Sequence, residues 1–223
     1  MNDVFNELID NICKRTNIKE FKYFKEFERL WRKKFEIASK ENILFISEET
    51  DDSQMFCYEG VLYGVKVKFD FNIDYLNANF EKCLNLNLIK KTNLQNSNGY
   101  LHYYSNPCSY TRYSCEDVNY NYPDMDKIYM VALPIVPQEF VIIDGNHRLC
   151  KQIYDNKTEI DVYYIFDNYA LMSLMKPIQI CLYAFLFDSS RIVYNLGKIK
   201  DGIIRNRLYI YNHNSTFFIA FNR

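Results

Sequence analysis

The sequence of 223 residues has little glycine, little proline and almost no excess of charge. Its six Gly and five Pro are too few for a collagen-like or linker-like chain. Lys and Arg number 27 against 28 Asp and Glu, which gives a formal net charge of −1. The chain is therefore no bulk polycation, and any contact with nucleic acid requires a local basic patch.

Long apolar runs and paired cysteine motifs are also missing. The nearest candidate for a membrane span, Ile178 to Phe187, has about half the required length. Met1 to Asp10 is polar and acidic where a signal peptide would be apolar. None of the seven cysteines forms a CxxC pair, so we predict neither a zinc ribbon nor a redox dithiol, and no cluster of metal ligands stands out in the sequence. These absences predict a cytoplasmic protein with reduced thiols and no membrane contact.

Apolar and aromatic residues are abundant, at 48% and 17% of the chain, which excludes a disordered protein. The length suits one large domain or two small ones. Helical spacing of apolar residues predicts two helices over residues 1–41, with a break at Thr16-Asn17. After them we expect a strand at 43–47, a hairpin over 55–71 around Glu59-Gly60, a helix over 73–90, and a polar loop or linker at 91–99.

The second half begins with residues 100–126, rich in Tyr, Ser, Asn and Asp, which indicate loops with short elements. After it we expect strands at 128–136 and 139–143, a helix from Leu149, a strand at 160–166, a helix over 169–187 that Pro177 kinks or divides, and a terminal hairpin of 208–211 and 216–221. This order predicts an α+β fold. We expect three regions, 1–92, 100–167 and 168–223, with one compact domain as the alternative.

The second expected helix carries a row of cations opposite its apolar stripe: Lys22, Lys25, Arg29, Arg32 and Lys33. Such a row is typical of a solvated helix face. The alternative is a surface that contacts DNA or a protein partner, because the nearby glutamates only partly offset its charge.

The most informative motif is Asp144-Gly145-Asn146-His147-Arg148, which lies between an expected strand and an expected helix. Gly145 allows a tight turn and a close approach to a ligand. The helix that follows offers backbone N–H groups to an anion, and His147 and Arg148 add cationic donors. Asp144 has three possible roles: orienting Arg148, holding a ribose hydroxyl or helping to bind a metal. The motif predicts a phosphate-binding turn, with an ordinary strand-to-helix turn as the alternative.

The motif and its surroundings resemble the ParB/sulfiredoxin superfamily over residues 100–167, with matches at Pro134-Ile135-Val136, Phe140 to Arg148 and Ile160-Asp161-Val162. The resemblance implies a small mixed-sheet core with added amino-terminal helices and a carboxy-terminal helix and hairpin. A loose match to a further family box, at Asn106-Pro107 and Arg112, implies that Arg112 also binds phosphate. Asn146 stands where sulfiredoxin-like proteins have their catalytic Cys, which argues against sulfinic-acid reduction. Cys150, one helical turn further on, is expected to be a packing residue.

The resemblance implies a nucleotide-binding protein whose ligand is ATP, ADP or CTP, with Mg²⁺ as a further ligand. Phosphate would lie against Gly145, Asn146, His147, Arg148 and Arg112. Transfer or hydrolysis of that phosphate would also need a carboxylate and a proton carrier, for which the candidates are Asp144, His147 and Glu139. Other carboxylates near the motif in sequence are Glu116, Asp117, Asp124 and Asp126.

Two alternatives remain. The first is a non-catalytic regulatory protein that binds DNA or protein through the basic helix. The second is a ParB-like nuclease, for which the sequence offers no convincing two-metal carboxylate set. The two other histidines are weaker signals: His102 is a possible pocket residue, and His213 is expected at an exposed tip.

Overall fold

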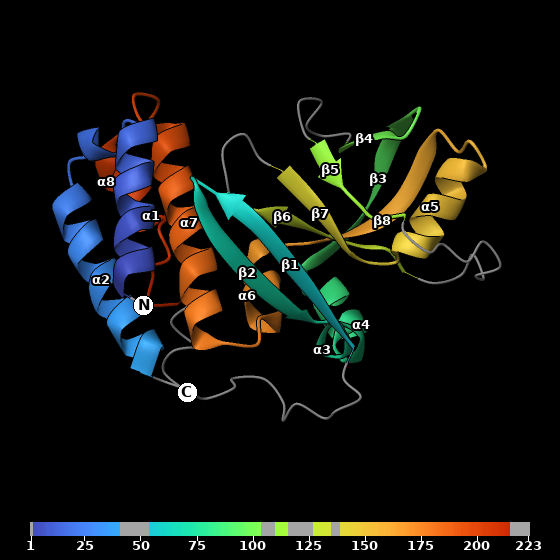
Figure 1. The fold of residues 1–223 in the computed structure, drawn as a ribbon, viewed down its shortest axis with the longest axis horizontal. Coiled ribbons are helices and arrows are strands. Elements are labelled where there is room, and N and C mark those ends of the chain that lie inside the picture. The colour runs from blue at the N-terminus through green and yellow to red at the C-terminus, as the bar shows by residue number, and fades with distance from the viewer. Residues whose placement is uncertain (1, 41–53, 104–109, 116–126, 135–138, 215–223) are drawn as a thin grey trace.

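The computed structural model describes residues 2–40, 54–103, 110–115, 127–134 and 139–214. Helices and sheets both contribute heavily, so the chain belongs to the α+β class. A helical layer forms one end of the molecule and a curled six-stranded sheet forms the other (Figure 1). A two-stranded hairpin lies between them. The expected strand at 43–47 lies outside the described residues.

The helical layer begins with the two expected amino-terminal helices, α1 (Asn2–Arg15) and α2 (Phe24–Lys40). A 3₁₀ turn at Ile18–Glu20 separates them. Their apolar stripes meet α7 (Pro177–Asn195) around the ring of Phe185. The centroids of four rings lie 5.0–6.0 Å from that of Phe185, those of Phe5, Phe27, Trp31 and Phe35. Aromatic pairs of this kind account for much of the aromatic excess in the sequence.

α7 is apolar around most of its circumference because it is covered on two sides. Phe185 faces α1 and α2, whereas Tyr183 contacts Phe69 of the hairpin and donates a hydrogen bond to the Ala132 carbonyl in the sheet (2.6 Å). Pro177 is the first residue of α7 and separates it from α6 (Asp167–Ser173), which confirms the predicted division. α7 is thus the element that joins the helical layer to the sheet.

The hairpin consists of β1 (Met55–Leu62) and β2 (Val65–Asn72). Its turn lies at Tyr63-Gly64, not at Glu59-Gly60 as predicted. Tyr63 and Gly64 have φ of 51° and 82°, the positive values that a two-residue type I′ turn requires at both positions. Val65, Val67 and Phe69 of β2 are buried while Lys66 and Lys68 between them are exposed, and from Phe69 to Asn72 the strand is buried on both faces.

Residues 73–90 do not form the single predicted helix. Asn72 caps a short α3 (Ile73–Ala78) by accepting a hydrogen bond from the Tyr75 amide (2.8 Å). Asn79 interrupts the helix before α4 (Phe80–Asn85) begins. The chain then enters β3 (Ile89–Ser97), so the prediction of a polar loop or linker at 91–99 is wrong.

β3 is polar because only part of it faces the core. Leu94 is fully buried, whereas Lys91 is exposed and pairs with Asp161 of the neighbouring strand (2.7 Å). Asn98-Gly99, with φ of 53° and 85°, turns β3 into β4 (Tyr100–Tyr103). An Asn-Gly pair is a strong signal for a type I′ hairpin, and it was the sequence clue to this one.

The six-stranded sheet has the order β4-β3-β8-β6-β7-β5. Its remaining strands are β5 (Tyr110–Arg112), β6 (Tyr129–Leu133), β7 (Glu139–Asp144) and β8 (Glu159–Ile165). The last three match predicted strands where these are described, whereas β5 lies in the stretch expected to hold loops with short elements. The sheet curls until its two edges meet: the Tyr113 hydroxyl, just after β5, donates to the Gly99 carbonyl beside β4 (2.7 Å). Its concave face holds a separate apolar cluster that includes Met130, Phe140 and Val162.

α5 (Asn146–Tyr154) packs Leu149 and Ile153 against this concave cluster. α8 (Asp201–Asn206) and the turns after it lie on the helical layer. Residues 208–211 form turns there, so the first strand of the predicted terminal hairpin is wrong, and its second strand lies outside the described residues. The predicted boundary between the first two regions falls on the β3–β4 hairpin, within one sheet.

Candidate functional site

The Asp-Gly-Asn-His-Arg segment lies at the junction of β7 and α5, as the sequence predicted, but the helix begins at Asn146 and not at Leu149, so three residues of the expected turn belong to its first turn. Gly145 is the residue before the helix and has φ of 85°. A Cβ at this position would lie 2.9 Å from both Ile128 Cα and the Lys127 carbonyl oxygen. Only glycine therefore fits this turn, for reasons of both backbone conformation and space.

The helix that starts here offers an anion-binding geometry. α5 has nine residues, and no side chain caps its amino terminus. The amides of Asn146, His147 and Arg148 belong to the first turn, which has no intrahelical acceptors. Partial positive charge at such a terminus favours anions. His147 belongs to that first turn and is half-buried.

Arg148 supports the turn from within. Its side chain is only 16% exposed, its guanidinium donates to the Lys127 carbonyl, and Nη1 lies 3.9 Å from Asp144 Oδ2. Asp144 also accepts a long hydrogen bond from Gln54 Nε2 (3.4 Å). Burial and the nearby Asp144 carboxylate raise the pKa of Tyr129, which is paired with Asp144 across the sheet. Arg148 thus holds the turn to Lys127, two residues before β6, and balances the charge of Asp144.

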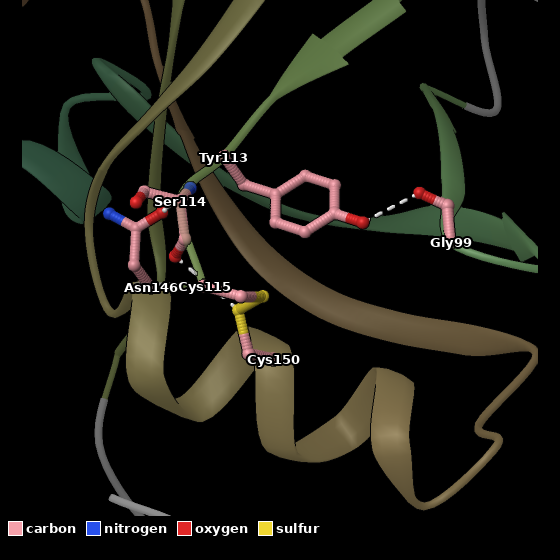
Figure 2. The surroundings of a disulfide bond; sticks show 6 residues. All are labelled: Gly99, Tyr113, Ser114, Cys115, Asn146 and Cys150. Atoms are coloured by element: carbon pink, nitrogen blue, oxygen red, sulfur yellow. Dashed lines mark hydrogen bonds between the residues drawn. A yellow bond between two sulfur atoms is a disulfide. The ribbon is translucent and has the colours of Figure 1, made fainter. Parts of the chain in front are cut away.

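Asn146 is joined to the chain after β5. Its Oδ1 accepts a hydrogen bond from the Ser114 amide (2.9 Å). Four residues further along α5, Cys150 forms a disulfide with Cys115, with a Cα–Cα distance of 5.7 Å (Figure 2). The expectation that Cys150 is only a packing residue, in a chain of reduced thiols, is corrected by this bond. No CxxC spacing could reveal it, because 35 residues separate the two cysteines.

Two predicted site residues lie elsewhere. Arg112 Nε contacts Glu139 Oε2 at 2.8 Å, which forms an ion pair at the start of β7. Asp144 ends the same strand five residues later, and an extended chain spans about 17 Å over that interval. The structure therefore brings Asp144 to Arg148 together and places Arg112 and Glu139 as a pair at the other end of β7. His102 lies on β4, opposite Gln95 of β3.

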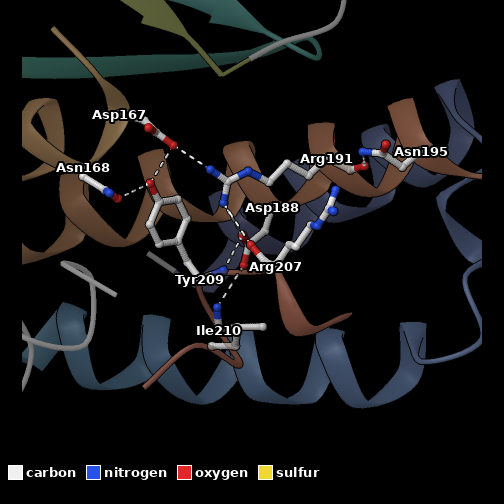
Figure 3. A network of polar contacts seen from close by, with 8 residues as sticks. All are labelled: Asp167, Asn168, Asp188, Arg191, Asn195, Arg207, Tyr209 and Ile210. Atoms are coloured by element: carbon white, nitrogen blue, oxygen red, sulfur yellow. Dashed lines mark hydrogen bonds and ion pairs between the residues drawn. The ribbon is translucent and has the colours of Figure 1, made fainter. Parts of the chain in front are cut away.

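Sequence reasoning missed a polar network in the helical layer (Figure 3). Asp188 on α7 is fully buried and accepts hydrogen bonds from the amides of Tyr209 (2.7 Å) and Ile210 (3.0 Å). Burial raises the pKa of Asp188 to about 7, against the opposing effects of Arg191 and the two amides. Arg191 Nη2 also pairs with Asp167 (2.6 Å), close to the Tyr209 hydroxyl. The sequence clue was an Asp in the middle of an apolar helix, with an Arg three residues later.

A polar cavity of about 550 Å³ adjoins this network, lined by residues that include Asn168, Arg191, Asn195 and Arg207. A second cavity of about 470 Å³ lies along α2, where Lys33 and Lys34 face Arg205 and His213. His213 is exposed, as predicted. These cavities are separate in sequence and position from the β7–α5 turn, and they make the carboxy-terminal segment the second polar region of the molecule.

The basic row on α2 is partly neutralised. Lys22, Lys25, Arg29 and Lys33 are exposed, but Arg32 pairs with Glu28 and also contacts Asn6. Glu26 of α2 pairs with Arg205 of α8 (3.1 Å), so this glutamate is already engaged with another cation. Lys25, Arg29 and Lys33 of α2, with Lys22 just before the helix, stay exposed. This arrangement fits both a solvated helix face and a surface that binds DNA or a protein partner.

Comparison of the chain with known proteins gave no relative. No protein-family model, curated protein or solved structure matches it. Within the described ranges, no three His, Cys, Asp or Glu side chains are grouped so that they could hold a metal ion. The described helices also include none with the length and apolar character needed to cross a bilayer. The site must therefore be interpreted from its own geometry.

Proposed function

We propose that this protein binds the phosphate of a nucleotide at the first turn of α5. The observation that carries the proposal is the turn itself: an uncapped helix terminus presented by a glycine that no other residue can replace without a clash. Three backbone amides and the His147 ring supply the contacts. The strand-turn-helix-strand order of β7, α5 and β8 agrees with the ParB/sulfiredoxin-like core that we propose for residues 100–167.

The contacts of the neighbouring side chains refine the assignment of roles. Arg148 and Asn146 are held by the Lys127 carbonyl and the Ser114 amide, so we assign them to positioning the turn. Asp144 is the carboxylate within the motif itself, and it would hold Mg²⁺ if the ligand brings it. Glu139 lies at the far end of β7 from the turn, and Arg112, whose backbone is opposite Val141, is engaged with it in an ion pair. The geometry therefore supports binding of ATP, ADP or CTP better than it supports phosphate transfer or hydrolysis.

The test is the thermal stability of the purified protein with ADP, ATP or CTP, each with and without Mg²⁺. We expect at least one nucleotide to raise Tm in proportion to the logarithm of its concentration. His147→Ala is expected to weaken that stabilisation, and Arg112→Ala is the matched control, since its ion pair lies at the other end of β7. Equal melting of the wild-type protein with and without all three nucleotides would refute the proposal.

The exposed cations of α2 favour a second candidate, a DNA- or protein-binding surface with Lys25, Arg29 and Lys33 at its centre. Binding to DNA would weaken steeply with salt, because counterions are released. Fluorescence anisotropy with a labelled duplex at two salt concentrations tests it, and a triple substitution of these cations by Gln should abolish binding. A duplex that stays unbound at low salt would remove the DNA version. The cytoplasmic location stays a proposal as well, and the disulfide argues against it, because disulfide bonds are rare in that compartment.

A further inference from the structure

The disulfide between Cys115 and Cys150 belongs to a contact that connects three parts of the fold. Tyr113, Ser114 and Cys115 follow the short edge strand β5. The Tyr113 hydroxyl donates to the Gly99 carbonyl beside β4, the Ser114 amide donates to Asn146, and Cys115 is bonded to Cys150. In Figure 2, Ser114 and Cys115 lie against Asn146 and Cys150 of α5, while the Tyr113 ring points away from the helix toward Gly99.

The disulfide is open to exchange from one side. Cys115 is exposed, whereas Cys150 is buried on the inner face of α5. β5 has only three residues and pairs with β7 on one side, so Cys115 lies just beyond a short strand at the edge of the sheet. Exposed disulfides with weak support from their surroundings exchange with thiols more readily than buried structural ones. An attacking thiolate would reach the Cys115 sulfur and release Cys150 as the leaving thiolate.

The other cysteines of known environment do not share these properties. Cys83 and Cys181 are buried and Cys13 is half-buried, all as free thiols. Cys57 is free and exposed, on β1 in the hairpin. It therefore offers a control thiol that lies in a different part of the fold.

We propose that Cys115–Cys150 is a reversible redox site that controls the order of the phosphate-binding turn. In the oxidised form the bond keeps the 113–115 segment on α5 and Asn146 in its contact with Ser114. A dithiol reductant gives two electrons and two protons: the S–S bond breaks, two thiols form, and the reductant becomes a disulfide. Without the bond, non-covalent contacts hold the segment, among them the Ser114–Asn146 hydrogen bond and the packing of Tyr113 against the concave cluster. The turn at Gly145 to Arg148 then becomes more mobile and binds phosphate more weakly.

This proposal rests on the proposed function only in its last step, and the experiment separates the two. The wild-type protein is equilibrated in glutathione buffers of graded ratio, and the Cys115–Cys150 pair is quantified by alkylation and mass spectrometry. We expect both forms to be populated across the series. A bond that stays wholly oxidised in every buffer, or wholly reduced in every buffer, would overturn the assignment as a redox site.

The second measurement is amide hydrogen exchange of oxidised and dithiol-reduced protein. We expect at least tenfold faster exchange in residues 113–115 and the first turns of α5 after reduction, beyond the acceleration that the loss of global stability gives the slowest amides of α2. Cys115→Ser should reproduce the reduced pattern without reductant, and Cys57→Ser should behave as wild type. Equal exchange of α5 in both forms would refute the proposal that the disulfide controls the order of this helix.

ADP binding is then measured by calorimetry on the same two forms. At least threefold weaker binding after reduction supports the coupling, whereas equal binding in both forms refutes it. If α5 exchange responds to reduction but neither form binds ADP, ATP or CTP, the proposed function fails and the redox control of α5 stands.

Discussion

Breaking the disulfide should cost this protein several kcal/mol of stability. The bond closes a loop whose ends are 35 residues apart, between an edge strand and α5. Loop-closure entropy in the unfolded chain predicts a contribution of about 4 kcal/mol at this length, and residual structure in the unfolded state lowers the effect to about 3 kcal/mol. Cys115→Ser is the preferred change because Cys115 is exposed, so the new hydroxyl meets solvent and not the apolar core.

The assay is equilibrium urea unfolding, followed by the fluorescence of Trp31 and by far-ultraviolet circular dichroism. Trp31 is the only tryptophan and is fully buried in the helical layer, so it reports loss of that layer. Coincidence of the two signals establishes that unfolding is two-state. Reduction of the wild-type protein should give the same loss as Cys115→Ser, and reductant should leave that variant unchanged.

Cys57→Ser is the matched control, since it removes an exposed free thiol without opening a loop. A loss of less than about 1 kcal/mol for Cys115→Ser, or a loss equal to that of Cys57→Ser, would refute the reasoning.

Three further predictions concern the turn, the buried carboxylate and the displaced ion pair. Gly145→Ala should lower the free energy of unfolding in urea by about 1 kcal/mol or more beyond the loss for Gly197→Ala. Both glycines have positive φ, but of the two only Gly145 would place a Cβ within 3 Å of backbone atoms, and equal losses would contradict this. The raised pKa of Asp188 means that the folded state holds its proton more tightly than the unfolded state does. The wild-type protein should therefore lose stability relative to Asp188→Asn as pH rises from about 4 to 7, at up to about 1.4 kcal/mol per pH unit. A stability difference that stays constant with pH would contradict this. Arg112→Ala should change stability by less than about 1 kcal/mol, because its partner Glu139 and Arg112 itself are partly exposed, and a larger change in Tm would show that the pair carries structural weight.

The sequence predicted elements where apolar periodicity or a breaker was strong. α1, α2, β7 and the division at Pro177 follow from such local signals. β3 was missed because its outward side chains are polar and its burial depends on β8, a strand more than 60 residues away. The 208–211 segment reads as a strand by composition, but the amides of Tyr209 and Ile210 bond to the Asp188 carboxylate, which is a tertiary contact that no local pattern reveals.

The candidate site was predictable only at its centre. Gly145 and the helix start were read from five consecutive residues, because the physical need for glycine at a tight turn is local. The placement of Arg112 depends on the parallel pairing of β5 with β7, which sets its backbone opposite Val141, from where its side chain reaches Glu139. The disulfide depends on the approach of β5 to α5, and only the assembled fold brings these elements together.

The central claim, phosphate binding at the first turn of α5, is tested most directly by nuclear magnetic resonance. Backbone amide signals of the oxidised, ¹⁵N-labelled protein are followed during titration with ADP, with and without Mg²⁺. The account predicts saturable shifts that are largest for Gly145, Asn146, His147 and Arg148, since a phosphate accepting hydrogen bonds moves the signals of the amides that donate them. Saturable shifts centred on α2 or on the cavity beside Arg191, or no shifts at residues 145–148, would contradict it.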